Sequence, residues 1–367
     1  MQLTKPITLS RKKATALTGV SIEAGAIAAA QVEPNGSTEL TGFAVEPLPP
    51  GVFRDGEVAD ADVLAAVLRS TFADHKLSKR IRLGIANQRV IVRTLRLPAI
   101  EDRKEMDAAI RFQAQEQIPM PLDQAVLEHQ VVGGVPGEEG APPQVDVVVI
   151  AARRDMITSF IEPLRRAGLE PEGIDLSAFG MIRALAGLSA VPVEPELEAP
   201  APAQEAFLYC DVGDVLNLAV ARGRACLFTR VSGNGMEAIV GRLTSERAMS
   251  PELAAQWLTH VGLEAQVETI EGDPELVAAT RAALRDGVAS LVDELRLSLD
   301  YYRALESAVP VSGVVLCGAG SAIRGLAVEM EEQLGLQVRS TAPPPLDRLD
   351  PALAARLVLP FGLAQES

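Results

Sequence analysis

The sequence predicts an α/β fold with two related halves, and three observations support this prediction. First, residues 205–235 contain three short apolar runs separated by glycine turns, which is the pattern of an antiparallel meander. Second, residues 19–46 repeat the same order of apolar run, acidic turn with glycine, and two further runs. Third, a strand-like run at 311–316 leads into Cys317-Gly-Ala-Gly-Ser321 and then into a helical pattern. A lobe that occurs twice explains the first two observations, and two unrelated hairpins are the alternative. The third adds a strand followed by a helix, as an α/β fold requires.

The composition is that of a globular protein large enough for two or three domains, with 367 residues of which 48% are hydrophobic. A net charge of −15 disfavours nucleic acid and anionic lipid surfaces as partners. The three cysteines lie in apolar runs, so we expect buried side chains, and the three histidines are isolated from other metal ligands. The sequence contains no apolar run near the roughly 18 residues of a membrane span and no secretory signal core. We therefore expect a cytoplasmic protein without direct membrane insertion.

Two turns are the first places to expect ligand chemistry. Glu23-Ala-Gly25 and Asp211-Val-Gly213 each follow an apolar run. Glycine in such a turn lets the backbone approach a ligand without a Cβ in the way. If the halves are related, the two turns are equivalent and face each other across a common cleft.

In the first half, residues 1–18 are polar and basic, and we expect them to form a mobile tail. Prolines after residue 46 end the first meander, because proline cannot donate to a strand ladder. A first lobe is thus predicted at 19–190, with an α+β module inserted at about 47–150. The expected elements beyond the meander are helices at 60–74, 101–117, 155–168 and 177–188, and strands at 81–86, 90–97, 125–132, 145–152 and 171–176.

The second half follows a proline-rich segment at 191–204, which predicts a linker or, alternatively, a recognition peptide for a partner. A second lobe is predicted at 205–350, and a last helix within 351–367 is expected to return to the first lobe. Between the meander and that helix, the predicted elements are helices at 236–247, 251–262 and 275–307, a strand at 311–316 and a helix at 322–334.

A series of short stretches is specific by its order and spacing, although each stretch is weak alone. These are Leu48-Pro-Pro-Gly51 with Asp55-Gly56-Glu57-Val58, Ile91-Val-Arg-Thr-Leu-Arg-Leu-Pro98, Ala109-Ile-Arg-Phe-Gln-Ala-Gln-Glu-Gln-Ile-Pro119, Ala151-Ala-Arg153, Ala167-Gly-Leu169, Asn217-Leu218, Phe228-Thr-Arg230, Glu294-Leu-Arg-Leu-Ser298 with Tyr301-Tyr302, and Cys317-Gly-Ala-Gly-Ser-Ala-Ile-Arg-Gly325. Together with the acidic turns, they make nearly the whole chain resemble the actin-like ATPase superfamily. Within it, the chain resembles the PilM family of type IV pilus and type II secretion machines.

The resemblance implies an actin-like fold of two ribonuclease-H-like lobes, with an inserted subdomain like that of the cell-division homologue FtsA in the first lobe. It also implies a nucleotide cleft, in which the two acidic turns flank the phosphates and metal and a later glycine turn lies under the adenosine. The matching positions are Glu23 and Gly25 at the first turn, Asp211 and Gly213 at the second, Gly318, Gly320 and Ser321 at the adenosine turn, and Glu294 and Ser298 toward the purine and ribose.

The first turn departs from the family pattern, which expects aspartate, glycine, several Ser or Thr and a lysine. Here Glu23 and Gly25 are followed by an alanine-rich run, and no hydroxyl follows Gly213 directly. Since donors and positive charge bind phosphate, we expect weakened ATP affinity and, still more, weakened hydrolysis. Two cofactor hypotheses stay open: ATP with Mg²⁺, with Asp211 as the metal residue, or no cofactor. No catalytic residue is assigned.

The resemblance further implies a partner, the short cytoplasmic N-terminal peptide of a PilN-like inner-membrane protein, together with other components of the pilus platform. It places that peptide between the first lobe and the inserted module, and the protein at the inner face of the membrane through its partners. The candidate residues for this contact are Arg89, Arg93, Leu95, Leu97, Ile110, Gln113, Ile118 and Pro119. For the arginines, a solvated strand edge protected by charge is the alternative.

Two other functions compete with such a scaffold role. An active ATPase or sugar-kinase relative would use Asp211 as general base or metal-orienting group, and the depleted first turn disfavours this function. A filament-forming relative like FtsA would need a terminal amphipathic membrane helix, and we expect the segment after Phe361 to be too short for one.

Overall fold

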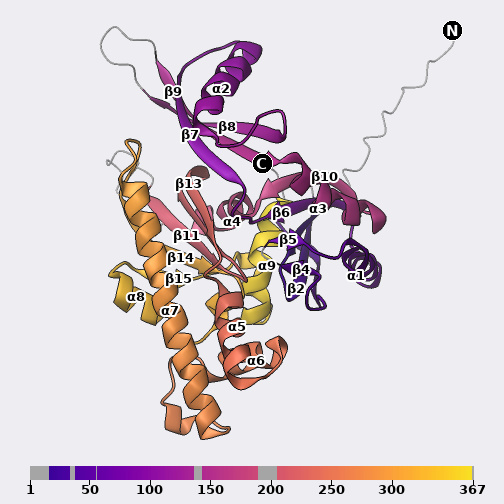
Figure 1. Ribbon diagram of the computed structural model, residues 1–367, viewed down its shortest axis with the longest axis vertical. Coiled ribbons are helices and arrows are strands. Elements are labelled where there is room, and N and C mark those ends of the chain that lie inside the picture. Colours follow the sequence, from indigo (N-terminus) through magenta and orange to yellow (C-terminus); the bar gives the residue numbers. More distant parts are fainter. Residues whose placement is uncertain (1–15, 34–37, 55, 136–142, 189–204, 366–367) are drawn as a thin grey trace, which may run out of the picture.

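A computed structural model describes residues 16–33, 38–54, 56–135, 143–188 and 205–365 (Figure 1). These residues form two lobes, with a smaller module that projects from them at the top of Figure 1. Two predicted features lie outside the described residues: the tail up to residue 15 and the linker at 191–204.

The first lobe is built on a five-stranded sheet with the order β10-β6-β1-β2-β3. Its strands are β1 (Leu17–Ile22), β2 (Ala26–Val32), β3 (Leu40–Pro47), β6 (Arg80–Ile85) and β10 (Glu170–Leu176). The first three strands pair as an antiparallel meander, whereas β6 adds to β1, and β10 to β6, as parallel strands.

The predicted boundary of the N-terminal tail at residue 18 is corrected, because β1 already includes Leu17 and Thr18. Leu17 is buried, and the Thr18 hydroxyl donates to the Ser78 carbonyl oxygen at 3.0 Å. These two residues therefore belong to the first sheet.

The second lobe repeats the topology of the first, with the strand order β13-β12-β11-β14-β15. Its strands are β11 (Ala206–Val212), β12 (Leu216–Arg222), β13 (Ala225–Ser232), β14 (Val311–Cys317) and β15 (Val338–Ser340). Again an antiparallel meander is followed by two parallel strands. The matching order confirms the predicted duplication of an α/β lobe.

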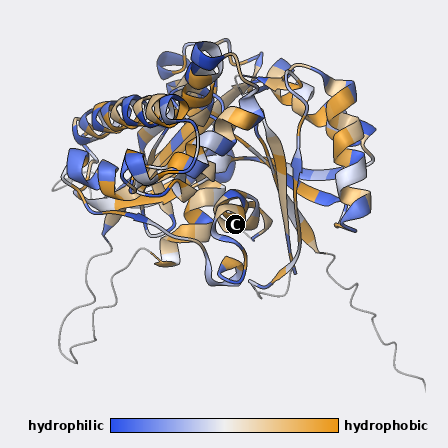
Figure 2. Cartoon of the chain, turned by 90° about the horizontal axis from the view of Figure 1, so that it is seen from below, coloured by the Kyte–Doolittle hydropathy of each residue, from blue (hydrophilic) through white to orange (hydrophobic). Residues whose placement is uncertain are grey.

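Helices cover both sheets. Those of the first lobe are α1 (Ala61–Asp74), α3 (Arg154–Arg166) and α4 (Ser177–Leu185), and those of the second lobe are α5 (Met236–Arg247), α6 (Pro251–Val261), α7 (Pro274–Arg303) and α8 (Leu326–Leu334). Hydropathy colouring shows apolar and polar residues alternating along the helices (Figure 2), as expected where one helix face packs on a sheet. Two short strands, β4 (Phe53–Arg54) and β5 (Glu57–Val58), pair with each other in the first lobe.

The last helix, α9 (Pro351–Ala364), packs on the first lobe against α4, β1 and β2. Glycines let the backbone of α9 come into contact with the backbones of α4 and β1. A Cβ on Gly362 would lie 1.8 Å from the Gly180 carbonyl oxygen, and one on Gly19 would lie 1.9 Å from the Pro360 carbonyl oxygen. Because Phe361 and most of its neighbours on α9 are buried in the same apolar cluster as β1 and β2, this helix is part of the first lobe's core.

The inserted module consists of β7 (Ile91–Pro98), α2 (Arg103–Gln117), β8 (Ala125–Val135) and β9 (Gln144–Arg153). Its strands form a separate antiparallel sheet of order β7-β9-β8, and α2 packs against this sheet. The predicted start near residue 47 is corrected to β7. The reason is that β6 pairs with β1 and α1 packs on α3, which places residues 47–85 in the first lobe.

Two further expectations concern the cysteines and the membrane. Cys210, Cys226 and Cys317 are buried and free, as predicted. Among the described residues, no helix combines the length and the hydropathy needed to cross a membrane.

Candidate functional site

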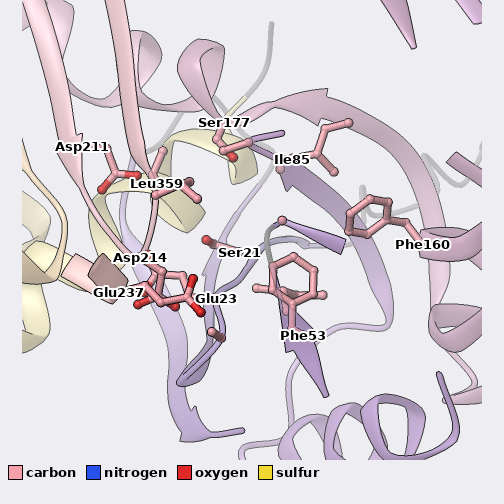
Figure 3. A pocket seen from close by; sticks show the side chains of 16 residues that line it. Ser21, Glu23, Phe53, Ile85, Phe160, Ser177, Asp211, Asp214, Glu237 and Leu359 are labelled. Carbon is pink, nitrogen blue, oxygen red and sulfur yellow. The ribbon is translucent and has the colours of Figure 1, made fainter. Parts of the chain in front are cut away.

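The two predicted turns meet at the junction of the lobes. Glu23 and Gly25 lie between β1 and β2, and Asp211 and Gly213 lie at the end of β11. A Cβ on Gly213 would be only 2.5 Å from Glu23 Oε1, so the turns are in direct contact. The pocket between them has a free volume of about 30 Å³ (Figure 3), which is room for one or two water molecules.

Asp214, just beyond the second turn, bonds back to the first turn. The Gly25 N–H donates to Asp214 Oδ2 at 3.3 Å, and the Ala24 N–H donates to the same carboxylate. In return, the Asp214 N–H donates to the Glu23 carboxylate. Each turn therefore satisfies backbone donors of the other turn with a side-chain carboxylate.

The three carboxylates at this junction repel one another in a buried setting. Burial, followed by the charges of Asp214 and Asp211, raises the pKa of Glu23 well above its usual value. Burial and the charge of Asp214 raise the pKa of Asp211 to about 7. Burial also raises the pKa of Asp214, against the opposing hydrogen bonds from Ala24 and Gly25. The positive charge of Arg356 on α9, whose Nη1 lies 3.6 Å from Glu23 Oε2, lowers all three pKa values.

Asp211 is also enclosed from the side of the second lobe. It pairs with Cys317 across β11 and β14, and a Cβ on Gly318 would lie 2.0 Å from Asp211 Oδ1. Its side chain is 3% exposed, and Oδ1 has no hydrogen-bond partner among the described residues. A buried, unpartnered carboxylate oxygen disfavours the charged form.

The remaining predicted nucleotide residues are engaged within the second lobe. The Ser321 hydroxyl donates to the Gly318 carbonyl oxygen at 2.8 Å, and Gly320 lies against Val212. The Ser298 hydroxyl is buried and donates to the Glu294 carbonyl oxygen at 2.7 Å.

The Glu294 carboxylate pairs with protein groups. Arg230 Nη2 lies 2.6 Å from its Oε1, and the Asn234 side-chain amide donates to its Oε2 at 3.3 Å. The structure thus brings Glu23, Gly25, Asp211, Gly213 and Gly318 together, whereas Glu294 and Ser298 do not line the pocket between the turns.

A second hollow lies between the inserted module and the first lobe. It has a volume of about 700 Å³, and we call it the β8–β10 groove because β8 and β10 lie on its two sides. Both are edge strands of their sheets, so each has unpaired backbone donors and acceptors along one side. The apolar residues that line the groove are Ile85, Val90, Val126, Ile150, Ala152, Ile157, Ile161, Ile174, Leu176, Phe179 and Ile182. Such a concave apolar surface with nearby polar groups is typical of a binding site.

None of the eight predicted partner residues lines the β8–β10 groove. Leu95, Leu97, Ile110 and Ile118 are at most 5% exposed and form the core between the module sheet and α2, which corrects their prediction as a contact surface. Arg89 pairs with Glu57, and Gln113 and Pro119 lie on or just after α2.

Arg93 lines a third hollow, the β7–β13 groove, which has a volume of about 810 Å³. This groove separates the module from the second lobe and is bounded by the edge strands β7 and β13 and by the end of α7. Its other arginines are already paired: Arg96 with Asp146 at 2.8 Å, and Arg230 with Glu294.

Asp214, Arg356 and the residues that line the β8–β10 groove are the features that sequence reasoning missed, although the resemblance implied a groove between these two parts. Asp214 adjoins the Asp211-Val-Gly213 turn, so its proximity to that turn was a usable signal. Arg356 and the groove depend on contacts between segments far apart in the chain, for which the local pattern carries no signal.

Two lobes of equal topology that meet at paired acidic turns, with a module inserted in the first lobe, define the actin-like ATPase fold class. A solved structure described as ethanolamine utilization protein EutJ from Carboxydothermus hydrogenoformans shares this fold. It superimposes with a TM-score of 0.53 at 13% identity, covering 95% of this chain and 89% of the other.

The family is shown by a sequence profile described as type IV pilus assembly protein PilM, which matches residues 19–345. A solved structure described as a PilM-PilN type IV pilus biogenesis complex is similar with a TM-score of 0.76 and 25% identity, over 96% of this chain and 98% of the other. The chain belongs to the PilM family of type IV pilus assembly proteins.

Proposed function

We propose that this protein serves type IV pilus assembly as a scaffold that holds an extended N-terminal cytoplasmic peptide of a PilN-like inner-membrane protein in the β8–β10 groove. Such binding would keep the protein at the inner face of the membrane through its partner.

The lining of the groove carries this proposal. Ile157 and Ile161 on α3 and Phe179 on α4 are only partly buried, although they lie side by side in a concave surface. Partly exposed apolar groups that line one groove gain about 25 cal/mol for each Å² that a ligand covers. This groove therefore favours an apolar segment over a small polar molecule.

The strand edges on its two sides favour an extended segment. Backbone groups at the free edges of β8 and β10 can pair with an added strand, while the apolar pockets between them receive alternate side chains. Charged groups at the groove, which include Glu128, Arg224 and the Asp175–Arg183 ion pair at 2.6 Å, can fix the direction of such a segment.

The comparison with solved structures supports the identity of the partner. A PilM protein has been solved as a complex with PilN, and the similarity of the present chain extends over 96% of its length. Since the whole fold is shared, a groove formed between module and first lobe is available to the same kind of partner.

The test is binding of a fluorescent synthetic peptide that reproduces the cytoplasmic N-terminus of the PilN-like protein from the same source. We expect saturable binding by fluorescence anisotropy. Ile161→Asp places a charge in the apolar groove and should weaken binding at least about tenfold, which corresponds to about 1.4 kcal/mol.

The matched control is Val328→Asp, which introduces the same charge at a 63% exposed apolar position on α8, far from the groove in the fold. Its affinity should equal that of the unaltered protein. Absence of binding to the unaltered protein, or equal weakening by both variants, would contradict the proposal.

A further inference from the structure

The first turn offers an anion site whose donors are backbone amides. The N–H groups of Ala24 and Gly25 both point to the Asp214 carboxylate, which belongs to the second lobe. The resemblance to actin-like proteins implies that the phosphate oxygens of a nucleotide would lie between these two turns. Asp214 thus supplies carboxylate oxygens where such a ligand would supply phosphate oxygens.

The contact is reciprocal, which ties the lobes to each other. The Asp214 N–H donates to the Glu23 carboxylate, and its carbonyl oxygen accepts a hydrogen bond from the Glu237 N–H, at the start of α5, at 3.2 Å. The second turn is therefore held in place by its own lobe while its carboxylate reaches the other lobe.

The residues around the pocket do not fit ATP with Mg²⁺. No lysine or arginine in the part of the chain that the structure describes lines the pocket, and its hydroxyls, Ser21 and Ser177, are buried. The three carboxylates Glu23, Asp211 and Asp214 and the nearby Glu237 would repel a polyphosphate. Among the described residues, no group of three His, Cys, Asp or Glu side chains is arranged to hold a metal ion.

We propose that Asp214 takes the place of a phosphate group in this protein, so that a protein carboxylate, and no nucleotide, bridges the two acidic turns. The cleft of the actin-like fold is then a permanent junction filled from within. This inference is independent of peptide binding in the β8–β10 groove, because Ile85 is the one described residue that lines both hollows and none of the acidic residues does.

The first test follows the amide hydrogens of the first turn by hydrogen–deuterium exchange. In the unaltered full-length protein, amides 24 and 25 should be protected. Asp214→Ala removes their acceptor, so exchange in this turn should accelerate at least about tenfold. Asp214→Asn keeps one acceptor oxygen and should give an intermediate rate, while Asp74→Asn on the exposed end of α1 should leave the rate unchanged.

The second test measures the melting temperature of the same proteins with and without millimolar ATP and Mg²⁺. We expect no shift for the unaltered protein, since a ligand that binds only the folded state must raise its stability. A raised melting temperature of the unaltered protein, or unchanged exchange at residues 24 and 25 in Asp214→Ala, would overturn the proposal. Peptide binding measured in parallel distinguishes this failure from failure of the scaffold role.

Discussion

The cleft between the lobes and the β8–β10 groove beside the module are built in opposite ways. The cleft has a free volume of about 30 Å³ and is filled by carboxylates that bond to backbone donors of the opposite lobe. The groove has a volume of about 700 Å³ and is lined by isoleucines and Phe179 that lack full cover. The difference supports the proposals that the cleft joins the two acidic turns and that the groove beside the inserted module binds the partner peptide.

The largest effect, a loss of folding stability, is expected from a substitution in α9, which packs beneath the cleft. Gly362→Val places side-chain atoms onto the Gly180 carbonyl oxygen, which already lies 1.8 Å from an ideal Cβ position. Such overlap between backbones should cost about 5 kcal/mol or more and prevent folding. Urea unfolding and soluble yield measure this effect.

The control for that variant is Gly187→Ala, because the Cβ added there has no atom within 4 Å. It should unfold like the unaltered protein. If Gly362→Val folds normally, the close backbone contact between α9 and α4 beneath the cleft is not required for folding.

The next effect is a pH dependence of folding stability, which we expect from the cleft and not from the groove. Because the folded state raises the pKa of Asp211 from 3.8 to about 7, the folded protein binds a proton more tightly than the unfolded one. Stability should therefore fall as the pH rises from about 4 to about 7. Asp211→Asn, which stays neutral, should have a smaller slope, of which the raised pKa values of Glu23 and Asp214 keep a part, and should be more stable at pH 8 by at most about 4 kcal/mol.

Thermal unfolding at pH 4, 6 and 8 checks this expectation, with peptide affinity at pH 8 as the second measurement. The affinity should be the same for both proteins, since Asp211 does not line the groove. Equal pH slopes for the two proteins would show that Asp211 stays ionised in the folded state.

A smaller effect is expected from the cation beside the carboxylates. Arg356→Met removes the charge 3.6 Å from Glu23, but this guanidinium is 37% exposed, so solvent screens the pair. We expect a loss of about 1 kcal/mol at pH 8 and less at pH 5, where the carboxylates are more protonated. Arg348→Met, at an exposed position, is the control, and equal losses in both variants would exclude a specific role of Arg356.

The smallest effect tests the other side of the module. Arg93→Glu reverses a charge in the β7–β13 groove and leaves the β8–β10 groove untouched. Affinity for the PilN-like peptide should change by less than about twofold in anisotropy titrations at physiological salt. A tenfold loss would move the proposed peptide site to the β7–β13 groove.

The duplicated lobes could be predicted because apolar runs and glycine turns recur in the same order in both halves. The same symmetry predicted that the turns of Glu23 and Asp211 face each other. The role of Asp214, three residues after Asp211, could not be predicted. Its carboxylate accepts hydrogen bonds from the first turn only when the first lobe lies against the second.

Four apolar residues that were predicted to contact the partner are buried, for a different physical reason. Apolar periodicity in β7 and α2 correctly indicates buried residues, and Leu95 and Ile110 are both about 1% exposed. Periodicity does not say which partner buries them, and here it is the module's own core. The exposed apolar groups of the β8–β10 groove come from strands and helices separated in sequence, so only the folded chain reveals them.

The position of α9 sets the order in which the molecule can assemble. Residues 351–364 complete the core around β1 and β2, which lie far before them in the sequence. During translation β1 and β2 therefore stay without this cover, with Ile27 and its neighbours exposed, until α9 has left the ribosome. One face of the second-lobe sheet packs in an apolar core of its own, so that core can form before α9 completes the first lobe.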